Sequence, residues 1–346
     1  MILDSKSHVE GEITSSSMLN RKEKRDASSD EQNLLLKHRA KIAEKLKLYE
    51  SECHRYEIQK VVLIQKCLME EVKQCNLESY GVGSLQCQVM FNCFAANPST
   101  PLTAISLKNN QINETCFQSM IHFIQTNGTL QVLNLESSKF GDEPAIILAE
   151  GISVSTSIVT LNLSNCNISD EAGEFLVNSL LSNFVLKELN LSFNTLSLKT
   201  ALAFTVVLKE NKTLQSLDLS HNNFCDENAV DNIIKGLSEN KSLHHLNLSW
   251  NSLSGENFGT LLSKSIKLSK LTTLNLEHNQ LKSFEIKKLT LGLKKSQTIR
   301  EVHIADNEIT EFDEIVLLKV FYSKSSLELM SFGKWFQLSH GACKVC

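Results

Sequence analysis

One eleven-residue pattern, L-x-x-L-x-L-x-x-N-x-L, recurs along the chain and constrains its fold more than any other feature. Eight clear copies are followed by a ninth that decays, with Trp335 at the asparagine position. Successive copies start 28 or 29 residues apart, at Leu102, Leu130, Ile158, Leu186, Leu214, Leu243, Leu271, Ile299 and Leu327. Self-similarity at such a period is typical of a solenoid, in which each unit packs only against its neighbours.

Each copy divides into a strand half and a helix half. Residues 189–191 (Leu-Asn-Leu) show the period of two that is typical of a short strand with one buried face. The asparagine that follows, such as Asn194, offers an amide to backbone groups that the strand ladder cannot reach, and Ser138 and Cys166 replace it in two copies. Helical spacing follows, as in the apolar residues Ala172, Phe175, Leu176 and Leu180.

Three features of the repeat are shared with a known family: the 28-residue unit, the phrase LxLSxN, and the stretch ISDEAGEFLVNSL that begins at Ile168. From Leu102 to Trp335 the chain resembles leucine-rich repeats of the ribonuclease-inhibitor type. The resemblance implies an α/β horseshoe, a solenoid with an inner parallel β-sheet and outer helices. The geometry agrees, because strands stack about 4.8 Å apart whereas packed helices need about 8–10 Å. Relatives of this type include ribonuclease inhibitor, Ran GTPase-activating protein, sensor arrays of NOD-like receptors, tropomodulin-like actin cappers and ciliary scaffolds.

The segments outside the clear repeats predict the remaining organisation. Residues 1–30 are polar and charged, which predicts a disordered tail. Residues 31–76 lack proline and glycine, which predicts a long helix, and a heptad stripe raises the alternatives of a coiled coil or of folding back on the first repeats. Residues 77–101 predict an N-terminal cap half-repeat, residues 102–335 eight to nine repeats, and residues 336–346 a C-terminal tail. The stripe is Leu35, Ile42, Tyr49, Tyr56 and Leu63.

Charge and hydropathy exclude several classes of protein. Lys and Arg number 35 and Asp and Glu 39, a net charge of −4, so we expect no nucleic-acid partner. No apolar signal-peptide core and no run of 18 apolar residues occurs, so we expect no membrane partner and a cytoplasmic location, with nucleus, cilium or cytoskeleton left open. Ten scattered cysteines predict free thiols. Residues 343–346 match a prenylation motif at Cys343, although lysine at an aliphatic position disfavours it.

Equivalent positions of the repeats form columns on the expected concave face, because the non-leucine positions of a strand point there. The column just before the asparagine contains Phe193, His221, Trp250 and His278 in four consecutive repeats. Three steps of about 4.8 Å predict an aromatic ridge roughly 14 Å long. His245 is expected nearby on the same face. Exposed rings beside polar neighbours are typical of binding hot spots, so these five residues are the predicted partner-binding site. The alternative is that the rings only cover the rim of the strands.

No motif indicates catalysis. GxxxxGK[ST], HExxH and GxSxG are absent from the sequence, and repeat arrays present broad surfaces, so we expect no enzyme. His221, His245 and His278 raise a zinc site as an alternative, but it needs converging rotamers and a fourth ligand, so no metal and no cofactor are expected.

The predicted function is therefore a non-catalytic intracellular scaffold that binds a protein partner on the concave face. Self-association through residues 31–76 would add a second contact. A regulator of a small GTPase, implied by the resemblance to the Ran activator, and a cytoskeletal or axonemal component are the alternatives.

Overall fold

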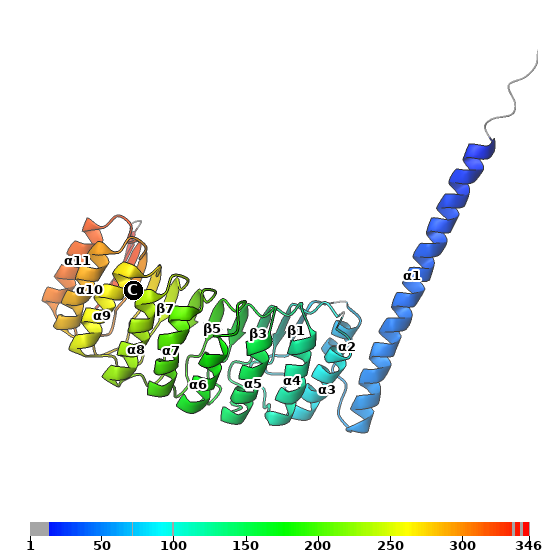
Figure 1. Ribbon diagram of the computed structural model, residues 1–346, viewed down its shortest axis with the longest axis horizontal. Helices are drawn as coiled ribbons and strands as arrows, with labels where there is room; N and C mark the ends of the chain where they lie inside the picture. Colours follow the sequence, from blue (N-terminus) through cyan, green and yellow to red (C-terminus); the bar gives the residue numbers. More distant parts are fainter. Residues whose placement is uncertain (1–13, 71, 99, 334–335, 340–341, 346) are drawn as a thin grey trace, which may run out of the picture.

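The computed structural model describes the backbone of residues 14–345 except 71, 99, 334–335 and 340–341, and side chains within 31–333 apart from 71, 99, 227 and 256. Ten short parallel strands alternate with helices in a curved array, from which one long helix projects at the N-terminal end (Figure 1). The strands are β1 (Gln74–Asn76), β2 (Ala104–Ser106), β3 (Val132–Asn134), β4 (Thr160–Asn162), β5 (Glu188–Asn190), β6 (Ser216–Asp218), β7 (His245–Asn247), β8 (Thr273–Asn275), β9 (Glu301–His303) and β10 (Leu329–Phe332).

The helices of the repeats form a second layer that covers one side of this sheet, whereas the first helix stands at its end (Figure 1). In chain order the helices are α1 (Thr14–Arg55), α2 (Val62–Leu68), α3 (Ser84–Ala95), α4 (Glu114–Thr126), α5 (Asp142–Val154), α6 (Asp170–Ser179), α7 (Leu198–Glu210), α8 (Glu227–Glu239), α9 (Glu256–Leu268), α10 (Ser283–Lys295) and α11 (Glu311–Ser323). The array matches the leucine-rich repeat solenoid, so the predicted fold class is confirmed.

The strands follow one another in sequence order and pair in register. Leu189 faces Leu217 in the next strand, and Leu217 faces Leu246. All three leucines are buried, because the leucine face of every strand points toward the helix layer. The register therefore places side chains of equal repeat position next to one another along the sheet.

Asparagine amides join the coils at both ends of the strand segments. Asn194 donates from Nδ2 to the carbonyls of Leu163 and Leu191, both at 3.0 Å, and accepts at Oδ1 from the amide of Cys166. A second ladder follows the helices, where Asn211 donates to the carbonyl of Leu180 at 2.8 Å. The sequence predicted the first ladder but not the second, whose members are Asn183, Asn211 and Asn240.

A coil that the repeat pattern did not predict precedes the first clear copy. Strand β1 pairs in parallel with β2, and Cys75 faces Ile105. Tyr80 stands at the asparagine position of this coil, so the template does not recognise it. Asn110 of the next coil satisfies the backbone there, since its Nδ2 donates to the carbonyl of Leu77 and its Oδ1 accepts from the amide of Val82. The segment 77–101, expected to be a cap half-repeat, thus contains α3 and part of a complete coil.

The N-terminal helix differs from the expected helix over residues 31–76. It begins at Thr14, inside the segment expected to be disordered, and ends at Arg55, beyond which Glu57 has a left-handed φ of 53°. Residues 1–13 lie outside the described residues. The chain then turns back, and the hydroxyl of Tyr49 accepts a hydrogen bond of 2.9 Å from the amide of Val61. Tyr49 and Cys53, in the last two turns of the helix, are buried.

The heptad stripe therefore packs partly within the chain, while the first half of α1 projects away from the repeats (Figure 1). Leu34 and Leu36, near the middle of α1, are exposed. Pairing of this helix with a second copy or a partner helix stays a prediction.

The C-terminal segment 336–346 was expected to be a tail, but its described residues extend the sheet. Strands β11 (Phe336–Ser339) and β12 (Ala342–Val345) pair antiparallel, β11 with β10 and β12 with β11. They pair with the edge that the last parallel strand would leave open. Trp335 and the side chain of Cys343 lie outside the described residues. Among the helices that the structure describes, none has the length and hydropathy needed to cross a bilayer.

Candidate partner-binding surface

Each loop between a strand and its helix passes through a left-handed residue. The φ angles of Phe193, His221, Trp250 and His278 are 55°, 52°, 56° and 51°. Their backbone N–H groups donate to carbonyls of the next repeat, as from Trp250 to Glu277 at 3.1 Å. The same position is left-handed in other repeats, at Asn109, Ser137, Asn165 and Asp306. The turn is therefore a property of the repeat and not of its side chain.

Aromatic side chains are unfavourable at this backbone position. Asparagine and aspartate tolerate left-handed φ, and histidine is also enriched there, whereas phenylalanine and tryptophan are rarely found. A strained conformation of this kind costs of order 1 kcal/mol at Phe193 and again at Trp250. The local backbone therefore favours residues such as Asn165, and other interactions must account for the rings.

The rings stack on one another. Centroids lie 3.8 Å apart between Phe193 and His221, 4.9 Å between His221 and Trp250, and 3.9 Å between Trp250 and His278. The interplanar angles of 14°, 15° and 19° make them nearly parallel. Phe193 is 53% exposed and Trp250 48%. We call these four side chains the ring ladder, and its spacing matches that of the strands below.

Burial and neighbouring charges shift the pKa of His221, one of the two histidines of the ring ladder. Burial lowers the pKa of His221, and nearby His278 lowers it further, while Asp218 acts in the opposite direction. His278 ends the ladder with Nε2 at 3.3 Å from Oδ2 of Asp306. His221 therefore favours its neutral form, which stacks between Phe193 and Trp250 without a charge to desolvate.

His245, the fifth predicted residue, lies in another column. It begins strand β7, where its register partners are Ser216 and Thr273, and its ring contacts that of His244 with centroids 6.5 Å apart. Trp250 separates the imidazoles of His221 and His278. The stack therefore disfavours a metal shared by the two, and no cluster of three metal-ligating side chains occurs within the described part of the chain.

A family model described as Leucine Rich repeat matches residues 154–177, 182–204, 210–227 and 239–256. The chain contains leucine-rich repeats. A comparison with curated proteins gives no match. Among solved structures the chain is similar to internalin C2 from Listeria monocytogenes, with 17% identity over 82% of this chain and 92% of that one and a TM-score of 0.39. It is also similar to actin-binding site 2 of leiomodin-1, with 16% identity over 52% and 87% of the chains and a TM-score of 0.34.

The matched leucine-rich repeats carry three rings of the ladder. Phe193, His221 and Trp250 fall inside matched segments, and His278 falls in the repeat that follows. The ribonuclease-inhibitor subtype stays a prediction.

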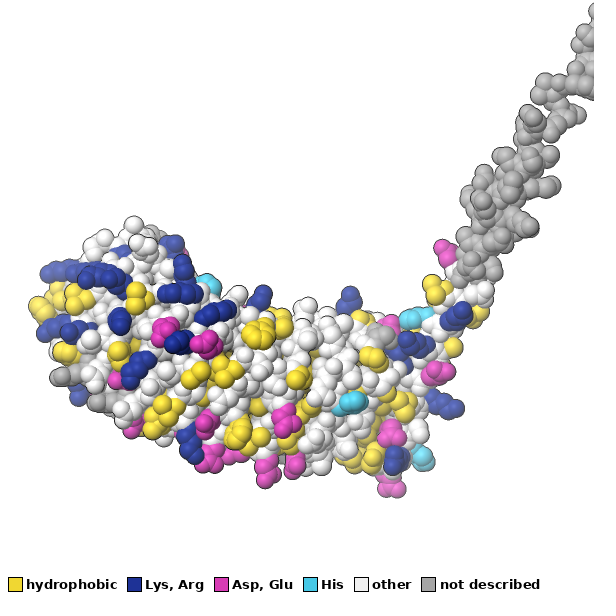
Figure 2. All heavy atoms as spheres, in the orientation of Figure 1, with side chains coloured by type: hydrophobic (Ala, Val, Ile, Leu, Met, Phe, Trp, Pro, Cys, Tyr) yellow, Lys and Arg dark blue, Asp and Glu magenta, His cyan; other side chains and the backbone are white. Residues whose placement is uncertain are grey.

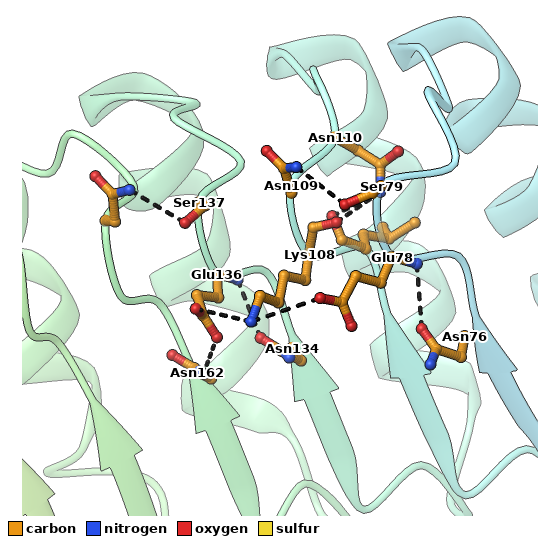
Figure 3. A network of polar contacts seen from close by, with 12 residues as sticks. Asn76, Glu78, Ser79, Lys108, Asn109, Asn110, Asn134, Glu136, Ser137 and Asn162 are labelled. Atoms are coloured by element: carbon orange, nitrogen blue, oxygen red, sulfur yellow. Dashed lines mark hydrogen bonds and ion pairs between the residues drawn. The ribbon is translucent and has the colours of Figure 1, made fainter.

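A network of charged residues beside the first leucine-rich repeats was not predicted from the sequence. Lys108 lies between two carboxylates, with Nζ 3.5 Å from Glu78 and 3.1 Å from Glu136, and Asn162 donates to Glu136 at 3.2 Å (Figure 3). These residues belong to loops after strands β1 to β3 and to strand β4. The column just after the inner leucines, Lys108 and Glu136 among them, held this signal, because alternating charges one repeat apart become neighbours in a register-stacked sheet.

Proposed function

We propose that this protein is a non-catalytic scaffold that binds a protein partner through the ring ladder and the adjoining concave strands. The observation that supports it is the presence of four stacked rings in consecutive loops whose backbone favours asparagine, with Phe193 and Trp250 about half exposed. Large rigid rings remove much area from water at little entropy cost, and tryptophan is enriched in binding hot spots. Phe193 and Trp250 thus fit the role of anchors.

We also propose that the protein works in the cytoplasm or another reducing compartment. Eight cysteines among the described residues are free thiols, and all but Cys225 are buried. Free buried cysteines are usual in reducing compartments and rare in secreted proteins.

The test is affinity purification with the full-length protein followed by affinity measurement on each recovered partner. We expect Trp250→Ala and Phe193→Ala each to weaken binding by more than about 1 kcal/mol. The matched control is Phe175→Ala with Phe184→Ala, because these phenylalanines are 55% and 70% exposed outside the ladder. Partners bound equally by the wild type and both ladder variants would contradict the proposal.

A further inference from the structure

The concave surface beside the ring ladder has a charge that defines the chemistry of its partner. We propose that the ring ladder and strands β5 to β9 bind a basic segment of a partner protein, in which lysine or arginine side chains alternate with apolar ones. This inference rests on the proposed docking function and adds the class of ligand.

Positive charge is missing from this surface. In the repeats of β4 to β9, the seven residues from each strand start to the asparagine position contain no lysine or arginine; they are 160–166, 188–194, 216–222, 245–251, 273–279 and 301–307. The same segments contain five carboxylates, namely Glu188, Asp218, Glu277, Glu301 and Asp306. All five side chains are at least partly exposed.

Neutral groups orient these carboxylates without cancelling their charge. Asp218 accepts from the amide of Asn247 at 3.1 Å, and Glu277 accepts from the hydroxyl of Ser331 at 2.7 Å. Threonine hydroxyls donate in the same way, from Thr160 to Glu188 and from Thr273 to Glu301. Histidines face the remaining oxygens, His278 at Asp306 and His303 at Glu277.

Cations near this surface lie outside it. Lys187 and Arg300 stand one residue before strands β5 and β9, at the opposite edge from the ladder, and Arg300 already faces Glu328 at 3.5 Å. In the first repeats, by contrast, Lys108 lies between two carboxylates (Figure 3). The carboxylates without a lysine or arginine in their segments thus lie in the repeats that carry the rings and in the β9 repeat that follows them.

Two outer helices of the C-terminal repeats, α9 and α10, have the opposite charge, whereas α11 contains three acids and one lysine. Lys and Arg side chains gather on their surface at the end of the array that holds α9 to α11 (Figure 2). Exposed members on α9 and α10 include Lys264, Lys267, Lys287, Lys294 and Lys295. The small net charge of −4 therefore hides a separation of charge between two faces of the same repeats.

Lysine and arginine suit the surface because each combines an apolar stem with a cationic head. The stems cover the half-exposed ring ladder, and the heads reach carboxylates such as Asp306, which already lies beside His278. An acidic segment would face five uncompensated negative charges. Complementary charge raises the association rate and excludes partners of the wrong sign.

The test measures binding of the full-length protein to three fluorescent peptides of equal length and equal apolar content. One peptide is basic, one neutral and one acidic. At low salt we expect the basic peptide to bind about tenfold or more tightly than the neutral one, with the preference shrinking as salt is added. The variant Glu277→Gln with Asp306→Asn keeps side-chain shape and removes two charges, and it should lose about fivefold or more in affinity.

The matched control is Glu150→Gln with Glu210→Gln, which removes the same charge from the exposed outer helices α5 and α7. It should leave the affinity for the basic peptide unchanged. Equal binding of the three peptides, preference for the acidic one, or no binding at all would overturn the inference. Uniform binding that still fails in Trp250→Ala would leave the docking function intact and remove only its charge preference.

Two other outcomes are also decisive. Basic-peptide binding that needs the carboxylates but neither Phe193 nor Trp250 would overturn the ring ladder as the docking site. Dimers of the protein alone that dissociate in the Glu277→Gln, Asp306→Asn variant would identify the basic outer face of a second copy as the occupant, and would overturn the proposal of a partner protein.

Discussion

Replacing Trp250 with asparagine separates a binding role of the ring ladder from a structural one. Trp250 is 48% exposed, so about half of the roughly 200 Å² of a tryptophan side chain is removed from water by the fold. At about 25 cal/mol per Å², losing that contact destabilises the repeat by about 2.5 kcal/mol. Asparagine relieves about 1 kcal/mol of backbone strain at a φ of 56°, which leaves a net loss near 1.5 kcal/mol.

Binding depends on the other half of the same side chain. The exposed half of Trp250 offers about 100 Å² to a partner, so Trp250→Asn should weaken binding by about 2.5 kcal/mol, or roughly seventyfold in Kd. The assay pairs isothermal titration of a recovered partner with urea unfolding followed by far-ultraviolet circular dichroism. The control Phe175→Asn on α6 removes a ring of similar exposure, 55%, and should lose stability without losing affinity.

The result that would refute this reasoning is a Kd unchanged by Trp250→Asn together with a loss of stability much larger than 1.5 kcal/mol. The rings would then serve only to cover the strands. A loss of affinity equal in Trp250→Asn and Phe175→Asn would instead show that both changes act through general unfolding.

Three further outcomes follow from the described contacts. Asn194→Ala should destabilise the array by about 3 kcal/mol or more, because it leaves several buried backbone groups of two coils without partners. A urea midpoint equal to that of the wild type would contradict the structural role of the asparagine ladder. Folding lowers the pKa of His221, so the contribution of its neutral ring to the free energy of unfolding should be complete above the unfolded-state pKa of about 6.5 and be lost as pH falls below that value. An NMR titration that gives His221 a pKa above 6.5 would contradict this. Lys45 is 2% exposed, and its Nζ lies 2.6 Å from Glu70. Glu70→Gln should therefore reduce the free energy that holds α1 in place by about 2 kcal/mol, which hydrogen exchange would detect as faster exchange over residues 42–55. Unchanged exchange would refute this prediction.

Much of the fold was predictable from local patterns. The 28-residue period, repeated without interruption, predicts in-register stacking, because each copy can bury its leucines only against the next. That register places Phe193, His221, Trp250 and His278 in one column, and the structure brings these four together as predicted. His245 was expected near Trp250 on the same face, and it lies at the start of strand β7, in a column of its own; its role in binding stays a prediction.

The remaining features depend on contacts between distant parts of the chain. The left-handed backbone at Trp250 arises from hydrogen bonds to the next repeat, and a tryptophan at that position does not predict a positive φ. Tyr49 of the heptad stripe is buried within the chain and α1 ends at Arg55, and a heptad stripe alone does not distinguish such packing from a coiled coil.

Charge separation likewise emerged only when the repeats were stacked. The carboxylates around Asp218 and the lysines of α10 are interleaved along the chain and nearly cancel in its net charge. Folding sends strand residues to one face and helix residues to the other, so the strand segments of β5 to β9 collect carboxylates, whereas α9 and α10 collect lysines. A repeating sequence encodes its own stacking because that interaction is between nearest neighbours, whereas the surface it presents depends on the spatial sum of many coils.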